Sequence, residues 1–444
     1  MLVTLKGSHM VKPTEPTSGN LSLSEWDQIG TINHASIIYF YQKPCQKWLT
    51  SSDSIVNSLK DSLSKILVTF YPLAGRLRRI GRGRLELDCN DAGVELIEAE
   101  SNANLEDFGY FSLSSECECL VPEVDYNVSL EELPLLLIQL TKFQCGGISL
   151  CISISHVVAD GLSMGHFISE WARTARGEQL QMAPVFDRQA LRANWHSPAL
   201  DGFELDHHPS LQIAQSSYVE QLEKTSDAML RLTKAQVEKI RNRANDGKMG
   251  RPYSRYEALT AHIWRCVSKA RGLKPDQRTA VGVCVDSRGR MQPQLPIGYF
   301  GNAIVDVAAV SRSGELVEES LGYACRIIRE AIEKVNNRYL RSIVNYLEKQ
   351  EDLTSFQDLY ALGSNQGPLY GYPNIGVVSL LTLPVYGKDF GFGKEICVRP
   401  GSYDFDGDTV IIPSAEGDGS VIVALCLQSG HMDAFKMYFY QDMF

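Results

Sequence analysis

The most constraining feature of the chain is an alternating segment at residues 148–155, which reads Ile-Ser-Leu-Cys-Ile-Ser-Ile-Ser. Its aliphatic residues occupy every second position, which is the period of a β-strand with two different faces. His156 follows at once, and residues 162–173 then carry apolar side chains at helical spacing. A strand that leads directly into a helix predicts an α/β fold. It also places His156 at the end of a strand, where side chains reach a cleft.

The length of the chain, 444 residues, exceeds one ordinary core. It fits about three domains of average size, or two lobes of about 200 residues each. We expect a first α/β lobe at residues 1–185. Periodicity is lost over residues 186–222, which contain several prolines and acidic groups and are predicted to be a crossover linker. The second lobe, residues 223–444, is also predicted to be α/β, with a long helix over residues 314–334.

Charge and composition argue against several classes of protein. The formal net charge of -10 disfavours nucleic-acid binding, because phosphate contacts need clustered Lys and Arg on a basic face. No apolar run reaches the roughly 18 residues of a membrane span, and the amino-terminal segment lacks the apolar core of a signal peptide. The eleven cysteines are irregularly spaced, without a CxxC pair for zinc, so we expect free thiols and no bound metal. These features predict a cytoplasmic protein.

His156 opens the first motif that could carry chemistry, His-Val-Val-Ala-Asp-Gly, in which Asp160 follows four residues later. An imidazole titrates near neutral pH, so a positioned histidine can accept a proton from an attacking nucleophile. The structural alternative is a packed histidine in a turn, with Asp160 capping the helix that follows. In a chain with nine histidines, such a spacing arises by chance about as often as not. The strand-end position favours a functional site.

A second motif, Asp-Phe-Gly-Phe-Gly, occupies residues 389–393. It begins like the DFG of protein kinases, but the chain lacks their catalytic HRD loop and glycine-rich nucleotide loop. Two glycines between aromatic residues instead predict a tight loop whose rings enter a core. The GxSxG elbow of serine hydrolases is absent, and the acidic run at residues 404–408 does not have the spacing of an EF-hand.

The two motifs together, in a chain of this length, resemble the BAHD acyltransferases of plants. The resemblance covers essentially the whole chain and includes further family-like stretches at residues 23–28, 71–77, 286–290 and 299–302. Within the family, spermidine hydroxycinnamoyl transferases are the most similar, at residues 23–28, 146–150 and 403–408. The resemblance implies a two-lobed α/β fold of the chloramphenicol acetyltransferase type. A channel between the lobes would bring acyl-CoA and acceptor together at the histidine.

The resemblance also implies roles for individual residues. His156 would be the general base, and Asp160 would point away from it and pair with Arg288. A late segment, residues 395–415, would return toward the first lobe. The loop of the second motif would be structural and distant from the reaction, through Asp389, Gly391 and Gly393.

Two positions depart from the family pattern. Ser155 stands where many members have a second histidine, and Phe392 stands where most have tryptophan. The first change removes no catalytic group, and the second keeps an aromatic ring in the loop.

The predicted reaction moves a hydroxycinnamoyl group from its CoA thioester to an amine of spermidine, a choice that rests on the resemblance. Acyl-CoA is then a co-substrate, and no permanently bound cofactor is needed, because a thioester is already activated. A primary amine with a pKa of about 10.4, like that of Lys, is nearly all ammonium at pH 7. A histidine that takes the proton as the C–N bond forms is typically worth about 10²–10⁴ in rate. The alternatives are an alcohol acceptor within the same family and a catalytically silent binding protein on this scaffold.

Acceptor contacts are harder to assign. Relatives that acylate shikimate or quinate have an arginine in an SxxRLP stretch, whereas residues 379–384 here read Ser-Leu-Leu-Thr-Leu-Pro, which disfavours a carboxylated acceptor. A polyamine needs carboxylates or aromatic faces for its ammonium groups. The oxyanion of the tetrahedral intermediate needs a hydrogen-bond donor, for which Thr382 is a candidate. The candidate substrate-binding residues are therefore His34, Tyr39, Thr382, Asp404 and Asp406, in a protein that we expect to be a monomer.

Overall fold

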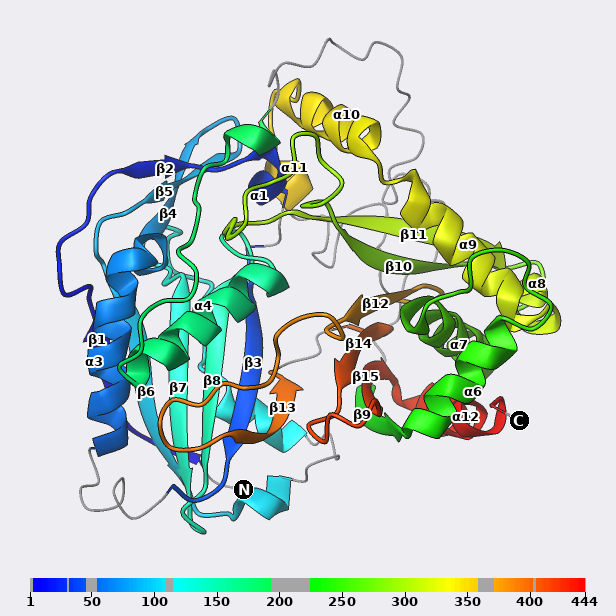
Figure 1. The fold of residues 1–444 in the computed structure, drawn as a ribbon, viewed down its shortest axis with the longest axis horizontal. Coiled ribbons are helices and arrows are strands. Elements are labelled where there is room, and N and C mark those ends of the chain that lie inside the picture. The colour runs from blue at the N-terminus through cyan, green and yellow to red at the C-terminus, as the bar shows by residue number, and fades with distance from the viewer. Residues whose placement is uncertain are drawn as a thin grey trace.

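The computed structural model describes residues 3–29, 32–44, 54–108, 115–192, 224–357, 371–401 and 405–443. Two six-stranded sheets, each with helices packed on it, form two lobes that lie side by side (Figure 1). The two-lobed α/β architecture predicted from the sequence is therefore confirmed. The expected linker at residues 186–222 lies mostly outside the described residues, which stop at residue 192 and resume at residue 224.

The first sheet is covered on both faces. In spatial order it consists of β1 (Val3–Val11), β6 (Val94–Ser101), β7 (Leu136–Phe143), β8 (Ile148–Ser155), β3 (His34–Tyr41) and β13 (Glu395–Pro400). The aliphatic side chains of β8 pack with two helices, α3 (Ser54–Thr69) and α4 (Gly161–Ala175). Cys151, on the other face of β8, belongs to a smaller apolar cluster. All eight residues of β8 are therefore buried. The aliphatic face of the strand packs on the helices, and the face that carries Cys151 and the serines lies against the smaller cluster.

The second sheet has its own helical cover. In spatial order it consists of β11 (Ile304–Arg312), β10 (Arg278–Asp286), β12 (Ile375–Ser379), β14 (Asp408–Pro413), β15 (Val421–Gln428) and β9 (Thr225–Leu232). Its helices are α6 (Lys234–Ala244), α7 (Arg255–Ala270), α9 (Leu321–Lys334) and α12 (Ser429–Gln441), and α7 contacts the other three. Trp264 of α7 is fully buried and donates its indole N–H to Thr279 Oγ1 at 3.1 Å, which ties the helix to β10.

The sequence predicts one helix over residues 314–334, whereas the structure has two, α8 (Ser313–Glu318) and α9. Glu319 between them is extended, with φ -71° and ψ 169°. The guanidinium of Arg265 donates to the carbonyl oxygen of Glu319 at 2.7 Å and also to that of Val317. These bonds satisfy carbonyl groups at the end of α8. The break therefore comes with a tertiary contact that the local sequence does not reveal.

Shorter elements lie around the two sheets. A three-stranded sheet has the order β2 (Asn20–Ser22), β5 (Arg84–Asp88) and β4 (Arg76–Gly81). The 3₁₀ helices are Tyr71–Ala74, Leu105–Phe108, Ser115–Leu120 and Gln189–Leu191. Helix α1 (Glu25–Gln28), from the amino-terminal part of the chain, contacts α10 (Asn337–Glu348) of the second lobe, and α11 (Thr354–Gln357) follows α10.

The chain passes from the second lobe to the first and back between β12 and β14. β13 pairs antiparallel with β3 at the edge of the first sheet, where Val398 lies opposite Tyr39 (Figure 1). β14 then pairs with β12 and β15 in the second sheet. Of the segment 395–415, only the first part therefore lies on the first lobe, because the pairing of β14 returns the chain to the second sheet.

The aromatic loop at residues 389–393 packs against the first lobe just before β13. Phe390 is fully buried and meets Trp171 of α4 edge-on, with ring centroids 4.7 Å apart. Phe392 meets Tyr41 of β3 in the same manner at 4.9 Å. Edge-to-face pairs of this kind add to the stabilisation from buried area. The second lobe thus inserts two rings between a helix and a strand of the first lobe.

The shape of this loop depends on its aspartate and its glycines. Asp389 Oδ1 accepts the backbone N–H groups of Gly391, at 2.7 Å, and Gly393, at 3.1 Å. The two glycines have φ values of 101° and 118°, in the region that glycine occupies without a steric penalty. These contacts support the structural role predicted for the motif.

Two further observations bear on the predicted class of protein. Within the described ranges, no helix combines the length and the apolar character that crossing a bilayer requires. The ten cysteines of that part of the chain form no disulfide bond with one another.

We expect Phe390→Ala to lower the free energy of unfolding by about 3–5 kcal/mol, the usual cost of truncating a buried phenylalanine. Denaturant-induced unfolding measures this change. The control is Ile80→Ala on β4, whose side chain is 53% exposed and whose loss should cost within about 0.5 kcal/mol. Equal effects of the two variants would contradict a plug formed by Phe390.

Candidate functional site

His156 lies in the turn between β8 and α4. Its backbone N–H donates to the carbonyl oxygen of Asn33 at 2.8 Å, and the N–H of Val158 closes the turn on Ser155 O at 3.1 Å. The residue is half-buried. Within the described part of the chain, no side chain forms a hydrogen bond with its ring. The backbone therefore holds the imidazole in place, while its two nitrogens remain without a protein partner there.

The Asp160 carboxylate is saturated with hydrogen bonds, none of them to the ring of His156 in the described part of the chain. The side chain of Asp160 is fully buried. Oδ1 accepts the backbone N–H of Ser163 at 3.0 Å and Arg288 Nη2 at 2.9 Å. Oδ2 accepts the backbone N–H of Ala303 at 3.0 Å and lies 2.8 Å from Arg288 Nη1. The expected pair of Asp160 and Arg288 is thus present in a bidentate form, and Asp160 also caps α4. These four donors occupy both oxygens of the Asp160 carboxylate. Asp160 therefore stabilises the shape of the turn and does not accept a hydrogen bond from the imidazole of His156.

We expect Asp160→Asn to lower the free energy of unfolding by about 3–5 kcal/mol, because it leaves the Arg288 charge largely buried without its carboxylate. The rate of acyl transfer should fall as well. Asp286→Asn is the matched control, since Asp286 Oδ1 lies 3.1 Å from the same guanidinium but its side chain is 53% exposed. Its loss should cost less than about 1 kcal/mol. Chemical unfolding of both variants separates the two cases, and an unchanged stability of Asp160→Asn would refute the structural role.

The carbonyl side of the turn is held by residues that the sequence analysis did not assign. Asn302 donates from Nδ2 to the carbonyl oxygens of His156 and Val157. Asp27 accepts the backbone N–H of Asn302 and forms an ion pair with Arg188. The sequence did mark residues 23–28 and 299–302, which contain Asp27 and Asn302, as family-like stretches. That resemblance does not show that the two stretches meet at the turn.

His34 lies beside the turn, because β3 pairs with β8 so that His34 is opposite Ser155. Its Nε2 donates to the carbonyl oxygen of Pro134 at 2.8 Å, and its Nδ1 accepts from the hydroxyl of Tyr126 at 3.0 Å. Burial lowers the pKa of His34, and the hydrogen bond to Pro134 opposes this shift. The ring is therefore neutral at pH 7, with both nitrogens already engaged.

Two of the predicted substrate contacts are corrected by the structure. Tyr39 is only 1% exposed, because it lies on the face of β3 that packs with the helices, and it does not line a channel. Asp406 is also buried. Its Oδ2 pairs with Arg271 at 2.6 Å, and its Oδ1 accepts the N–H of Gln428 at 2.9 Å. A carboxylate with these partners is not available to an ammonium group. Asp404 lies outside the described residues.

Thr382 is exposed in the segment that follows β12. The next residue, Leu383, packs so closely on Gly161 that a Cβ at Gly161 would lie 3.2 Å from Leu383 Cδ1. Gly161 is the first residue of α4, so the neighbour of Thr382 contacts the helix directly after the turn that holds His156. Its role as a donor to the oxyanion stays a prediction.

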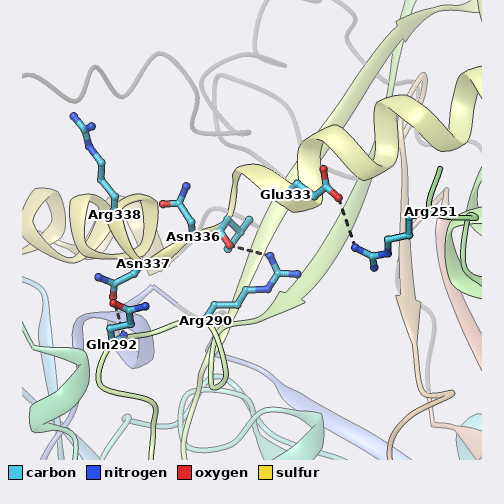
Figure 2. Close-up of a pocket in the computed structure, with 8 residues that line it drawn as sticks. Arg251, Arg290, Gln292, Glu333, Asn336, Asn337 and Arg338 are labelled. Carbon is cyan, nitrogen blue, oxygen red and sulfur yellow. Dashed lines mark hydrogen bonds and ion pairs between the residues drawn. The ribbon is translucent and has the colours of Figure 1, made fainter. Parts of the chain in front are cut away.

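A separate hollow of about 640 Å³ lies between the junction of α9 and α10 and the loop that follows β10 (Figure 2). Arg290 donates to the carbonyl oxygens of Ile332 and Val335 at 2.9 Å each, and Arg251 lies 3.8 Å from Glu333. Two of the three arginines that line this hollow, Arg251 and Arg290, are thus already engaged by contacts within the protein. The hollow is lined by Arg251, Arg290, Gln292, Glu333, Val335, Asn336, Asn337 and Arg338.

Comparison with known proteins identifies the family of the chain. The sequence model of a family described as the Transferase family matches residues 1–442. The chain is also 43% identical, over 452 residues, to the hydroxycinnamoyl-CoA:piscidic acid hydroxycinnamoyltransferase of Actaea racemosa, and the match covers 100% of both proteins. The chain belongs to the BAHD acyltransferase family. As a member of that family it is a CoA-dependent acyltransferase.

Other similarities are consistent with this family. The hydroxycinnamoyl-CoA:5-hydroxyanthranilate N-hydroxycinnamoyltransferase of Avena sativa is 34% identical over 448 residues, which cover 98% of this chain and 99% of the relative. The crystal structure of F. graminearum TRI101 complexed with coenzyme A and deoxynivalenol has a TM-score of 0.77 at 18% identity, and the match covers 95% of this chain and 97% of that one. The structural similarity confirms the two-lobed fold.

Proposed function

We propose that this acyltransferase moves a hydroxycinnamoyl group from CoA to a nucleophilic acceptor, with His156 as general base. The observation that carries the proposal is the state of the His156 ring. It is half-buried at the end of a strand, it has no side-chain partner among the described residues, and its backbone is fixed on both sides. A packed structural histidine would have a hydrogen-bond partner for its ring, as the buried His262 does in the carbonyl oxygen of Phe439 at 2.8 Å.

The proposed mechanism has two steps. The acceptor attacks the thioester carbonyl carbon while a ring nitrogen of His156 takes the proton from the attacking O–H or N–H group. The resulting tetrahedral intermediate then collapses, the C–S bond breaks, and the protonated imidazole returns the proton to the departing sulfur. The products are the ester or amide and free CoA, so protons balance within one turnover. No covalent enzyme intermediate is required.

Other residues support this base. The Asp160–Arg288 pair holds the turn, and a donor must stabilise the charge on the tetrahedral oxygen. We assign that donor to the hydroxyl of Thr382, because its neighbour Leu383 contacts the start of α4. His34 would contribute a neutral, apolar ring face beside the turn. The channel between the lobes, a monomeric state and a cytoplasmic location complete the proposal as sequence-based expectations.

The acceptor that we favour is the hydroxyl group of a carboxylic acid. The relative at 43% identity over its whole length is named for piscidic acid. In addition, the buried ion pair with Arg271 removes Asp406 as a ligand for a polyamine. Spermidine is the second candidate. It is supported by the absence of arginine from residues 379–384, where relatives that acylate shikimate or quinate have one.

We expect His156→Ala to lower the rate of CoA thiol release by at least about 10²-fold, the lower end of the effect of a general base. The assay follows free thiol with p-coumaroyl-CoA and the best acceptor. The matched control is His9→Ala on β1, at the far edge of the first sheet, which should keep the full rate. A rate that is unchanged in His156→Ala would reject the proposed mechanism.

We expect piscidic acid to support faster thiol release than spermidine at equal concentration, with an ester as the product. Mass spectrometry of products from separate incubations with piscidic acid, 5-hydroxyanthranilate and spermidine measures this preference. A dominant spermidine amide would instead establish the second candidate. Thiol release that no acceptor stimulates above hydrolysis would indicate a binding protein on this scaffold.

A further inference from the structure

Asn302 contacts the catalytic turn from the second lobe. It immediately precedes Ala303 and β11, and it is 4% exposed. Its Nδ2 donates to the carbonyl oxygen of His156 at 2.7 Å and to that of Val157 at 3.0 Å. A side-chain amide has two N–H hydrogens, so both can be used on two consecutive carbonyl groups of the turn.

The orientation of this amide is determined by its surroundings. Besides the two carbonyl oxygens, Asp27 Oδ1 lies 3.3 Å from Asn302 Nδ2. If the amide were rotated by half a turn, its oxygen would face three acceptors, which is unfavourable. The amide oxygen therefore points away from the turn, where it has no hydrogen-bond partner within the described ranges.

The backbone of Asn302 is held as firmly as its side chain. Asp27, which is fully buried, accepts the Asn302 N–H at 3.0 Å. Asp27 Oδ2 accepts Arg188 Nε at 3.1 Å and the Ser24 hydroxyl at 2.7 Å. Arg188 also donates to the carbonyl oxygen of Phe300, two residues before Asn302. Two distant segments of the chain, at Asp27 and at the turn, thus bond to one asparagine, and Arg188 holds the residues just before it.

This arrangement fixes the peptide planes on the carboxyl side of His156, while Asn33 fixes its N–H. A general base must lie within about 2.6–3.2 Å of the proton that it takes, and a misplacement of about 1 Å can cost about 10²-fold in rate. We infer that Asn302 is a positioning residue for the reaction: its amide sets the direction of the His156 side chain by holding the two carbonyl groups. The inference rests on the proposed role of His156 as the base.

The first test is Asn302→Ala. We expect kcat to fall about 10- to 100-fold, because the base is displaced but still present. KM for both substrates should stay within about threefold, since the lost interaction acts in the transition state. The pH at which the rate changes should not move, because Asn302 does not touch the ring.

Asn374→Ala is the matched control. Asn374 is 6% exposed, and its side-chain oxygen accepts the backbone N–H of Ala280 at 2.9 Å within the second lobe. This variant therefore also removes a buried side-chain amide, but it leaves the turn and the Asp160–Arg288 pair untouched. It should lose stability and keep kcat. If both variants lower kcat equally, the loss in Asn302→Ala reflects a general loss of structure and not the position of His156.

A double-mutant cycle tests whether Asn302 acts through His156. In the His156→Ala background, Asn302→Ala should lower the residual rate by less than about twofold, because no base remains to be positioned. Additive losses would overturn the inference. If Asn302→Ala does not fold, Asn302→Ser replaces it, and kcat should again fall, because one hydroxyl hydrogen cannot hold two carbonyl groups.

The outcomes for the two proposals are distinct. An unchanged rate in His156→Ala rejects the proposed mechanism whatever Asn302 does. A large loss in His156→Ala together with an unchanged kcat in the folded Asn302 variant rejects only the positioning role.

Discussion

The buried ion pair between Asp160 and Arg288 is the interaction on which the geometry of the site depends. Burying a carboxylate is costly unless its lone pairs are used, and here two backbone N–H groups and a bidentate guanidinium use them. Asp160 belongs to the turn of the first lobe, whereas Arg288 follows β10 of the second lobe. The pair therefore joins the lobes at the residue that ends the turn. The position of His156 is consequently a property of both halves of the chain.

A second connection acts on α4 from the opposite end. The aromatic loop inserts Phe390 against Trp171, while Lys388 donates from its ammonium group to Ser169. Burial lowers the pKa of Lys388 to about 8, which reflects how closely this segment is packed on the helix. The helix is thus held at its first turn by the ion pair and along its length by the loop. Because α4 continues directly from the turn that holds His156, each contact that fixes the helix also restricts the turn.

The sequence predicted the parts of the site that are formed by residues close together in the chain. Alternation at residues 148–155 located the strand, and the end of that strand located His156. Contacts between segments that are distant in sequence were not predictable from one sequence, so Asn302 was not assigned a role. The same limit explains the corrections. Asp406 looks like a free carboxylate in an acidic run, but Arg271, which pairs with it, lies 135 positions earlier. Tyr39 could have faced either side of β3, and packing of the helices decided which.

The strand that the second half contributes to the first sheet has a consequence for the integrity of each half. β3 has β8 on one side and β13 on the other. A polypeptide that ended near residue 185 would leave the backbone donors and acceptors of β3 open to any other extended chain, a template for edge-to-edge association. It would also leave an unfilled space beside Trp171. The first sheet is therefore completed only by a strand from the carboxy-terminal half of the chain.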